Sequence, residues 1–286
     1  MLEKEYKQRI SQAITYIRNN VDRNLTVDEI ADYCCFSKYY FNRIFRSVVN
    51  ESLYSFIKRM KLESAAFMLR SNRRTSITDI ALLVGYSPSN FATAFKENFG
   101  MSASEYRKVN EVPVKESYLS VVEHIKSMKK DKDCFAKVDQ KIKIKTLNKL
   151  ILEYERFIGN YFDLAEHWER FCNSVEERNL MNEEARFIGI SYDDPLITDE
   201  NHCIYDMCIT VERQQSVNTH KIEGGKYACY EFFDKLENLS KAYNEIFTIW
   251  LPYTKYDIRN GMPIEIYLSQ TDAEGRMRID LCMPIK

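Results

Sequence analysis

A polar run between residues 88 and 99 carries side chains that could read the edges of DNA bases. Hydroxyl and amide groups exchange hydrogen bonds with base edges in the major groove, and a lysine can pair with a backbone phosphate. The outward-facing members of the run are Ser89, Asn90, Thr93 and Lys96. Its apolar members, one helical turn apart, are Phe91, Phe95 and Phe99. The spacing predicts a helix with a buried apolar stripe and a polar face.

A second short helix and a tight turn must hold this run in place. Ser76 can cap the earlier helix, with Asp79 as the acid of a capping box. Gly85 can take a positive φ and end that helix. Ser87 followed by Pro88 is an N-cap with proline at the first helical position. Helix, glycine turn and helix with a polar outer face form the arrangement of a DNA-reading helix-turn-helix.

The same pattern occurs fifty residues earlier in the chain, which indicates an internal repeat. The matched pairs are Ile30 and Ile80, Ala31 and Ala81, Phe36 and Tyr86, Ser37 and Ser87, Phe41 and Phe91, Phe45 and Phe95, and Arg46 and Lys96. Thr26 with Glu29, and Ser37, are expected to cap the two helices of this first unit. Cys35 stands where the second unit has Gly85, so the first turn is less clearly marked.

One helix is expected between the two units, from Ser52 to Arg70. Nineteen residues at about 1.5 Å each make a rod of roughly 28 Å, and one turn of DNA measures roughly 34 Å. Such a helix could hold two reading helices in successive major grooves on one face of the duplex. A last helix of this region should begin at Ser102, with Glu105 in its capping box.

Charge is distributed unevenly along the 286 residues, which are enough for two domains. Residues 1–110 hold 17 Lys and Arg against 11 Asp and Glu, whereas the remaining residues hold 24 against 31. A basic half joined to an acidic half indicates different partners for each, and phosphates are the natural partner of the basic half.

Cysteine and histidine usage favours a reduced, cytoplasmic protein without a metal or other cofactor. None of the 8 cysteines forms a C-x-x-C pair, and the 4 histidines lack zinc-site spacing. The N-terminus has no signal-peptide core, and no apolar run approaches the roughly 18 residues of a membrane span. We therefore expect no membrane partner.

Residues 5–108 resemble the DNA-binding domain of the AraC/XylS family of transcription regulators. The motifs that carry this resemblance are IADYCCFSKYYFNRIFR (30–46), DIALLVGYSPSNFATAFKENFG (79–100) and SASEYR (102–107). It implies double-stranded DNA as a partner and an all-α domain with two helix-turn-helix units, which we place at residues 1–110.

The resemblance also implies roles for single residues of the first unit. Tyr39, Asn42 and Arg43 occupy the family's base-facing positions. Arg43 could pair with a guanine edge and Asn42 with an adenine. Lys38 and Arg46 would contact phosphate.

The second unit is expected to discriminate bases weakly. Its outward residues Ser89, Asn90 and Thr93 are short, and the arginine that some relatives carry at the position of Thr93 is absent. Lys96 would then serve as a phosphate anchor, while the first unit does most of the base reading.

Residues 111–140 read as a linker. Val112-Pro113-Val114 ends the helical pattern, and a lysine-rich polar segment follows. Residues 117–128 could form a short amphipathic helix. Such a helix could approach DNA, but we expect a solvated connector.

The apolar period changes to that of strands in residues 141–286, and the order strand, helix, strand, strand occurs twice. Y-D-M-C-I (205–209) matches I-D-L-C-M (279–283), and Leu164 with Trp168 matches Leu239 with Tyr243, at offsets of 74 and 75. The repeat predicts an α+β domain with pseudo-twofold symmetry and a groove between its halves.

This half resembles the GyrI-like effector-binding domains. The carrying motifs are GISYDDP (189–195), YDMCITV (205–211), IEGGKYA (222–228) and PIEIYL (263–268). The resemblance implies a buried acid among aromatic side chains that receives cationic, often aromatic, ligands. An AraC-type domain followed by a GyrI-like domain is a known regulator architecture.

Glu265 is the acid at the matching position. Ile264 and Ile266 share one face of the expected strand, while Glu265 and Tyr267 share the other, which faces the groove. A carboxylate with aromatic walls binds organic cations by charge pairing and cation–π attraction. The candidate walls are Trp168, Tyr205, Tyr227, Tyr230, Trp250 and Tyr267.

These features favour a sequence-specific transcription regulator, an activator, that senses a small molecule and contacts RNA polymerase. An alternative is that the C-terminal domain hydrolyses its ligand with Glu265 and either Tyr230 or Tyr267. No Ser-His-Asp, metal or phosphate-loop pattern supports an enzyme. A second alternative is a protein-interaction module with no ligand, which a groove filled by side chains would favour.

Overall fold

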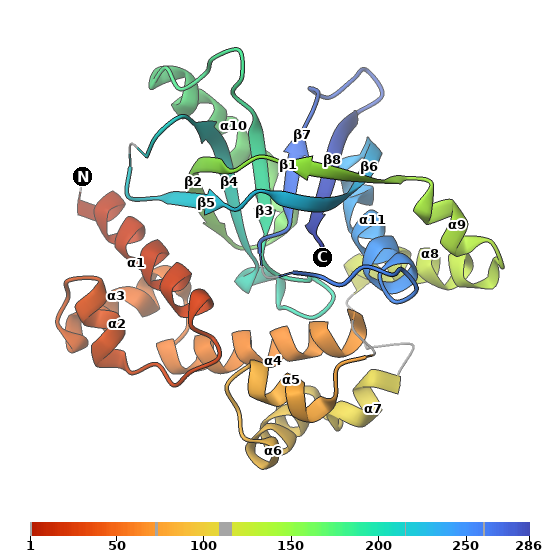
Figure 1. The fold of residues 1–286 in the computed structure, drawn as a ribbon. Helices are drawn as coiled ribbons and strands as arrows, with labels where there is room; N and C mark the ends of the chain where they lie inside the picture. The colour runs from red at the N-terminus through yellow and green to blue at the C-terminus, as the bar shows by residue number, and fades with distance from the viewer. Residues whose placement is uncertain (1, 72–73, 109–115, 215, 260) are drawn as a thin grey trace. The chain divides into compact units, whose positions relative to one another are not determined.

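The computed structural model describes residues 2–71, 74–108, 116–214, 216–259 and 261–286. Its contacts divide the chain into two compact units, Met1–Val112 and Pro113–Lys286. The first unit is helical and the second combines helices with one sheet (Figure 1). The proline-containing start of the expected linker, residues 111–115, lies outside the described residues.

Helices make up the first unit, in the order that the repeat predicts. They are α1 Leu2–Asn19, α2 Val27–Tyr33, α3 Lys38–Val49, α4 Leu53–Ser71, α5 Ile77–Leu83, α6 Pro88–Phe99 and α7 Ala103–Lys108. The connecting helix α4 has the expected 19 residues. Figure 1 shows α4 between the α1–α3 group and the α5–α7 group.

Side-chain caps start most of these helices where the sequence predicts them. Thr26, Ser76 and Ser87 each accept a hydrogen bond from the backbone N–H three residues on, at 3.1, 3.0 and 3.4 Å. Ser37 stands at the N-cap of α3, within the described part of the chain, but makes no such bond. The side-chain cap predicted there is wrong, although the helix begins at the expected residue.

Both helix-turn-helix turns pass through the left-handed region. Cys35 has φ 57° and Gly85 has φ 70°. The helices that follow also end alike, at Asn50 with φ 60° and Gly100 with φ 71°. The repeat therefore extends to the backbone of the turns, including the first turn, which the sequence marks less clearly.

Aromatic side chains form much of the helical core. Phe45 of α3 packs on Phe56 of α4 with ring centroids 5.4 Å apart, and Phe95 of α6 packs on Tyr106 of α7 at 5.3 Å. All four residues are at most 1% exposed. The phenylalanine stripe of the first helix-turn-helix unit is thus buried against α4, and that of the second packs against α7.

One antiparallel sheet organises the described part of the second unit, with strand order β1-β6-β8-β7-β3-β4-β2-β5. Its strands are β1 Ile142–Leu147, β2 Leu150–Ile158, β3 Phe187–Ser191, β4 Ile204–Val211, β5 Thr219–Ile222, β6 Gly225–Lys235, β7 Ile264–Tyr267 and β8 Arg276–Pro284. The helices are α8 Leu119–Lys130, α9 Cys134–Asp139, α10 Leu164–Glu177 and α11 Leu239–Glu245, which continues into a π-helical turn, Ile246–Trp250. Single 3-10 turns occur at Glu116–Tyr118, Tyr161–Asp163, Glu200–His202 and Leu236–Asn238.

The strand order shows the predicted pseudo-twofold repeat. From one edge inward the sheet reads β5, β2, β4, β3, and from the other edge β1, β6, β8, β7. The two halves meet where β3 pairs with β7. The repeat is one strand longer than expected in each half, because β1 and β5 occupy matching edge positions.

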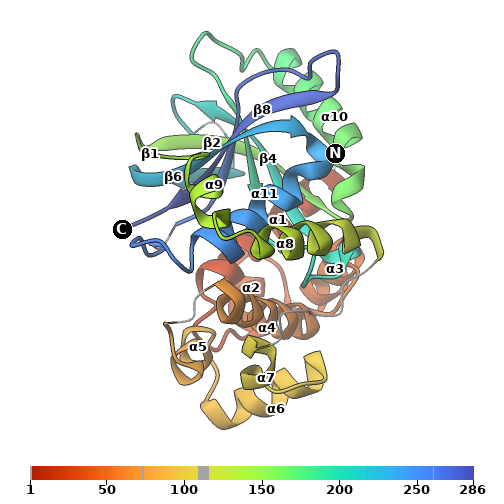
Figure 2. The ribbon, with the colours of Figure 1, turned by 90° about the vertical axis from the view of Figure 1, so that its right-hand side faces the viewer.

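Strand register puts α10 and α11 on the same face of the sheet. Met207 pairs with Gly189, Gly189 with Glu265, and Glu265 with Leu281, so these residues form one row on one face. Met207 packs in the core beside α10, and Leu281 in the core beside α11. Glu265 therefore lies in the middle of the row, between the parts of the sheet that the two helices cover. Figure 2 shows α10 and α11 on the same side of the sheet.

Helix α8 is not a free connector. Its residue Ile125 belongs to the same core as Ala242 and Ile246 of the α11 segment, and Val121 is buried against Leu196. The amphipathic helix predicted in the linker is present, but it packs on the second unit and is not solvated on all sides.

Candidate DNA interface and effector site

The predicted base-reading residues of the first helix-turn-helix unit share the exposed face of α3. Tyr39, Asn42 and Arg43 are exposed, and Tyr39 keeps 82% of its surface accessible. Phe41 and Phe45, on the opposite side, are fully buried. The 3.6-residue period of the helix separates the two sets, so burial of the phenylalanines turns the polar set outward.

Weak local contacts hold these side chains in the structure. The Arg43 guanidinium lies 5.2 Å from the ring centroid of Tyr40, and the Asn42 amide donates to the carbonyl of Lys38 at 3.2 Å. Lys38 Nζ pairs with Asp28 Oδ2 at 2.8 Å, with both side chains more than half exposed. Exposed pairs of this kind contribute little and are readily exchanged for a phosphate or a base.

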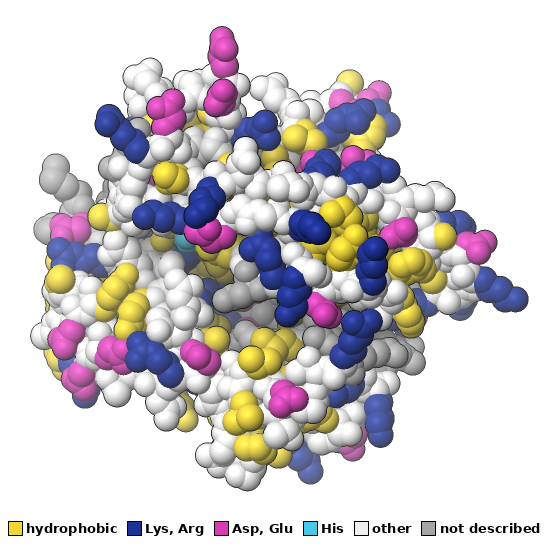
Figure 3. Space-filling view, in the orientation of Figure 1, with side chains coloured by type: hydrophobic (Ala, Val, Ile, Leu, Met, Phe, Trp, Pro, Cys, Tyr) yellow, Lys and Arg dark blue, Asp and Glu magenta, His cyan; other side chains and the backbone are white. Residues whose placement is uncertain are grey.

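Helix α6, the second predicted reading helix, exposes shorter polar side chains than α3. Ser89, Asn90, Thr93 and Lys96 are all exposed. The Thr93 hydroxyl donates to the carbonyl of Ser89 at 3.4 Å, which directs it back to its own helix. On the face seen in Figure 3, Lys and Arg side chains are scattered among acidic and apolar ones. The roles of these residues in DNA binding therefore rest on the reading helices and stay predictions.

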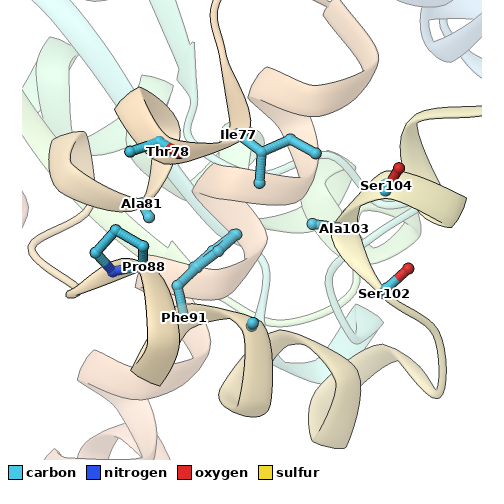
Figure 4. Close-up of a pocket in the computed structure, with 9 residues that line it drawn as sticks. Ile77, Thr78, Ala81, Pro88, Phe91, Ser102, Ala103 and Ser104 are labelled. Atoms are coloured by element: carbon cyan, nitrogen blue, oxygen red, sulfur yellow. The ribbon is translucent and has the colours of Figure 1, made fainter.

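A shallow pocket of about 250 Å³ lies beside α6, between α5, α6 and α7 (Figure 4). Its lining is Ile77, Thr78, Ala81, Pro88, Phe91, Ala92, Ser102, Ala103 and Ser104. None of the side chains predicted to contact DNA or an effector lines it. Ser102, Ala103 and Ser104 supply the small side chains on one side of it.

Glu265 occupies the place that the sequence predicts for a buried acid. It is 1% exposed, and its strand neighbour across the pseudo-twofold is Gly189. A Cβ on Gly189 would lie 1.9 Å from the Tyr205 hydroxyl and 2.6 Å from Glu265 Oε2. Glycine is required here because any side chain would fill the space that the carboxylate and the phenol occupy.

Three tyrosine hydroxyls surround the Glu265 carboxylate. Tyr205 donates to Oε2 at 2.5 Å, Tyr267 donates to Oε2 at 3.1 Å, and Tyr243 donates to Oε1 at 2.6 Å. The Tyr205 and Tyr267 hydroxyls also lie 2.9 Å apart. We call Glu265 with Tyr205, Tyr243 and Tyr267 the tyrosine cluster.

Burial and hydrogen bonding act in opposite directions on this acid. Desolvation is the larger effect and raises the pKa of Glu265, while the tyrosine hydroxyls stabilise the carboxylate and lower it. Burial and the neighbouring carboxylate both raise the pKa of Tyr205 and of Tyr243 well above the usual range. The tyrosines therefore stay protonated and act as donors.

Trp168 completes the cluster from the α10 side. Its ring centroid lies 5.0 Å from that of Tyr267 and 6.2 Å from that of Tyr205. Tyr243 reaches Glu265 from α11, the pseudo-symmetric helix. Tyr243 is absent from the residues predicted as walls. Its match to Trp168 at an offset of 75 was the signal that could have identified it.

The other predicted walls lie in different surroundings. Tyr230 donates to Glu245 Oε2 at 2.7 Å, and Trp250 donates to Asp139 Oδ1 at 2.7 Å. Tyr227 lies under the Arg259 guanidinium, 4.8 Å from its ring centroid, in the core of the opposite sheet face. Aromatic composition does not distinguish these positions, because strand parity and register decide which ring meets Glu265.

A second buried acid, Glu245 of α11, lies on the face of the sheet that α10 and α11 cover. Besides Tyr230, it accepts from Lys141 Nζ at 2.9 Å, and its Oε1 lies 2.7 Å from His124 Nε2. Burial alone would raise the pKa of Glu245, but these hydrogen bonds outweigh it and lower the pKa. This cluster joins α11 to α8.

In the described ranges, His, Cys, Asp and Glu side chains do not gather in a group of three or more that could hold a metal ion. Among the helices of the described residues, none combines the length and apolar character that a bilayer span requires.

Comparisons with known proteins match each unit separately. The family of GyrI-like small molecule binding domains matches residues 140–286, and a helix-turn-helix domain family matches residues 8–109. Regulatory protein SoxS of Salmonella typhimurium is 35% identical over 103 residues, which cover 36% of this chain and 95% of SoxS. HTH-type transcriptional activator AarP of Providencia stuartii is 33% identical over 99 residues, covering 34% of this chain and 73% of AarP.

Among solved structures, the C-terminal domain of EcmrR aligns with a TM-score of 0.44 and 15% identity, covering 51% of this chain and 96% of that chain. The C-terminal domain of AraT from Geobacillus stearothermophilus aligns with a TM-score of 0.34 and 29% identity, covering 35% of this chain and 84% of that one.

The two units define a DNA-binding transcription regulator with a small-molecule binding domain. The chain belongs to the GyrI-like family and carries an AraC-type helix-turn-helix domain. Both resemblances and the fold class expected from the sequence are confirmed. The relatives of the helix-turn-helix domain are regulators and include an activator.

Proposed function

We propose that this regulator reads a specific DNA sequence with its helical unit and senses a small organic cation at Glu265. The observation that carries the proposal is the setting of Glu265, a buried carboxylate between two helix-covered parts of the sheet with aromatic rings around it. A desolvated carboxylate and aromatic faces both attract cations. A ligand with an aromatic body would also bury apolar area against Trp168.

Binding requires one tyrosine to move, since both Glu265 oxygens already accept hydroxyls. Tyr243 is the candidate, because it is partly exposed and is the tyrosine that donates to Oε1. A cation that replaces its hydroxyl would leave Tyr205 and Tyr267 on Oε2. Tyr243 and Glu245 lie on one helix, so such a movement would shift Glu245 and, through its contact with His124, helix α8.

For DNA, we propose that α3 reads bases through Tyr39, Asn42 and Arg43, with Lys38 and Arg46 on phosphate. In α6, Ser89, Asn90 and Thr93 face the bases, and Lys96 anchors phosphate. AarP is named as a transcriptional activator, and we propose the same sign here, with RNA polymerase as a further partner.

A second candidate is a protein-interaction module without a small ligand. The observation that favours it is the closed tyrosine cluster, in which hydroxyls of the chain already occupy the acid. A domain whose buried acid is already satisfied by its own hydroxyls needs no ligand and could serve a protein partner. Binding of a cation to the isolated regulator separates the two candidates.

The test is calorimetric titration of the full chain with tetraphenylphosphonium, and with triphenylphosphine oxide as its neutral analogue. We expect the cation to bind the wild type and Glu265→Gln to weaken it by roughly tenfold or more, the equivalent of about 1.4 kcal/mol. Asp280→Asn is the matched control, because this buried acid points to the other sheet face and pairs with Lys145 at 2.6 Å. Equal cation affinity in wild type and Glu265→Gln would remove the acid from the site. No heat with any aromatic cation would favour the protein-interaction module.

A further inference from the structure

Lys61 is a buried lysine at the centre of α4, the helix that joins the two helix-turn-helix units. Its residue surface is 5% exposed. Lysine is almost never fully buried unless its ammonium has a partner, because the charge loses its hydration. Lys61 therefore calls for an explanation that the DNA-reading helices do not supply.

The Lys61 ammonium lies where the two helix-turn-helix units meet, within the helical part of the chain. Nζ donates to the backbone carbonyl of Arg23, at 3.2 Å, in the turn that follows α1. It also lies 5.7 Å from the ring centroid of Tyr86, in the turn of the second unit. A single side chain thus contacts a segment of the first helix-turn-helix unit and a segment of the second.

The glycine of the second turn belongs to the same contact. A Cβ on Gly85 would lie 2.6 Å from the Asp22 carbonyl oxygen and 2.7 Å from Lys61 Nζ. The turn of the second unit therefore presses directly against the segment after α1. We call Asp22, Arg23, Lys61, Gly85 and Tyr86 the inter-unit contact.

The repeat itself supports a special role for this contact. Cys35 takes the same left-handed backbone in the first unit, yet it carries a side chain and is exposed. The first turn tolerates a Cβ because it faces solvent. Gly85 has a second requirement besides its φ of 70°, namely close approach to the other unit.

Electrostatics favour a fixed arrangement at this point. Burial lowers the pKa of Lys61, and the Asp22 carboxylate opposes that shift. The ammonium donates to the Arg23 carbonyl and is favoured at longer range by the charge of Asp22, both in the segment after α1. If the two helix-turn-helix units rotated about α4, the Lys61 ammonium would lose these oxygen partners without gaining free access to water.

We propose that Lys61, through the inter-unit contact, sets the relative orientation of the two helix-turn-helix units and with it the spacing between the two DNA segments that they read. Lys61 is a positioning residue, since its side chain is directed into the domain and not to the reading faces. A helix alone fixes the distance between the units, but the contact fixes their rotation about it. The inference rests on both units binding DNA.

The test measures spacing preference and not affinity alone. Duplexes that bind the full-length wild type are first selected from a random library, and the two segments are identified by scanning substitutions. Their separation is then changed by one and two base pairs. For wild type, we expect a shift of one base pair to weaken binding by roughly tenfold, because the second segment rotates and translates away from α6.

Lys61→Met keeps the apolar stem and removes the ammonium. We expect it to retain its affinity for a non-specific duplex, while the loss on shifting the spacing falls to roughly threefold or less. Lys61→Arg should restore most of the wild-type preference, because it keeps a cationic donor. Lys58→Met is the matched control. It removes the same charge from α4, but Lys58 lies outside the inter-unit contact, and its partly exposed pair with Glu97, at 3.6 Å, contributes little.

Gly85→Ala disturbs the same contact without changing Lys61, and it serves if Lys61→Met does not fold. It should also flatten the spacing preference. An unchanged spacing profile in whichever of these two variants folds would overturn the proposal, even if overall affinity falls. A wild type without any spacing preference would overturn it as well.

Discussion

Glu265 and Arg43 place the two proposed activities on single side chains with opposite surroundings. Glu265 is buried and fully hydrogen-bonded, so its charge state depends on its neighbours. Arg43 is exposed, with a tyrosine ring beside it, so its contribution to binding depends on the base or phosphate that it contacts. Each therefore predicts a different measurement.

Cation binding at Glu265 should depend on pH. The ionised carboxylate attracts a cation and the protonated acid does not, and burial raises the pKa of Glu265. Affinity for tetraphenylphosphonium should therefore rise with pH through a range above the usual glutamate titration, and level off beyond it. Titrations at several pH values, repeated with Glu265→Gln, check this expectation. Identical pH profiles for the two proteins would contradict the assignment.

Arg43→Ala should lower specific DNA affinity by about 1–3 kcal/mol and relax one base position, because a bidentate contact to guanine would be lost. Lys96→Ala should instead weaken binding to all sequences and reduce the salt dependence by about one phosphate contact. Anisotropy titrations against single-base variants of a selected duplex distinguish the two. An Arg43→Ala variant with unchanged base preference would remove Arg43 from base reading.

At the scale of elements, the equivalent turns of the two helix-turn-helix units have the same backbone conformation but different surroundings. The first turn has a cysteine in the left-handed region, exposed and with φ 57°, whereas the second has a glycine against another segment. A non-glycine residue in this conformation costs roughly 1–2 kcal/mol. The first turn therefore stores strain that its surroundings do not require.

Cys35→Gly should stabilise the helical unit by up to about 1 kcal/mol, since glycine removes the strain but loses more backbone entropy on folding. Cys35→Ala is the control, because it removes the thiol and keeps the Cβ. Urea unfolding of the full chain, followed by amide exchange in α2 and α3, gives the difference. Equal protection in the two variants would show that the turn is not strained.

Helix α11 links three features of the second unit. Tyr243 joins the tyrosine cluster, Glu245 joins His124 of α8, and the π-helical turn begins at Ile246. A π-helical turn is a costly departure from regular helix and often accompanies a functional site. Movement at Glu265 would thus reach α8 through one short, irregular element.

At the scale of the molecule, each unit has its own buried core. In the second unit, the sheet face opposite Glu265 holds an ion pair in which Arg156 donates twice to Asp206, both at 2.7 Å. The Asp206 carboxylate also meets Tyr192 and His220, at 2.8 and 2.7 Å. This network ties β2, β4 and β5 together, because its members come from those strands and the loop after β3.

Asp206→Asn should destabilise the second unit by about 3–5 kcal/mol, because it leaves the buried Arg156 guanidinium without its counter-charge. Exchange protection should fall in the strands and stay unchanged in α3 and α6. Burial would raise the pKa of Asp206, but Arg156 and His220 outweigh it and lower the pKa to about 2. The carboxylate's contribution is therefore present above its unfolded pKa and is lost as pH falls towards 2. Asp234→Asn, at an exposed site, is the control, and an equal loss of protection in α3 would contradict independent units.

The sequence by itself determined the two resemblances, the double helix-turn-helix and the repeated α+β order. Caps at Thr26, Ser76 and Ser87, the phenylalanine stripes and the strand alternation around Glu265 are local features, so neighbouring residues suffice to predict them. The buried acid was predictable for the same reason, since strand parity separates Glu265 from Ile264 and Ile266.

Tertiary structure alone decided which distant side chains meet. Tyr227, Tyr230 and Trp250 are aromatic like the members of the tyrosine cluster. Sheet register places the Tyr205 and Tyr267 hydroxyls on the Glu265 carboxylate, and the packing of α11 adds that of Tyr243. Helix α8 packs on α11 because apolar residues from both enter one core. Contacts such as Lys61 with Arg23 depend on the path of the whole chain, and no local pattern of residues encodes them.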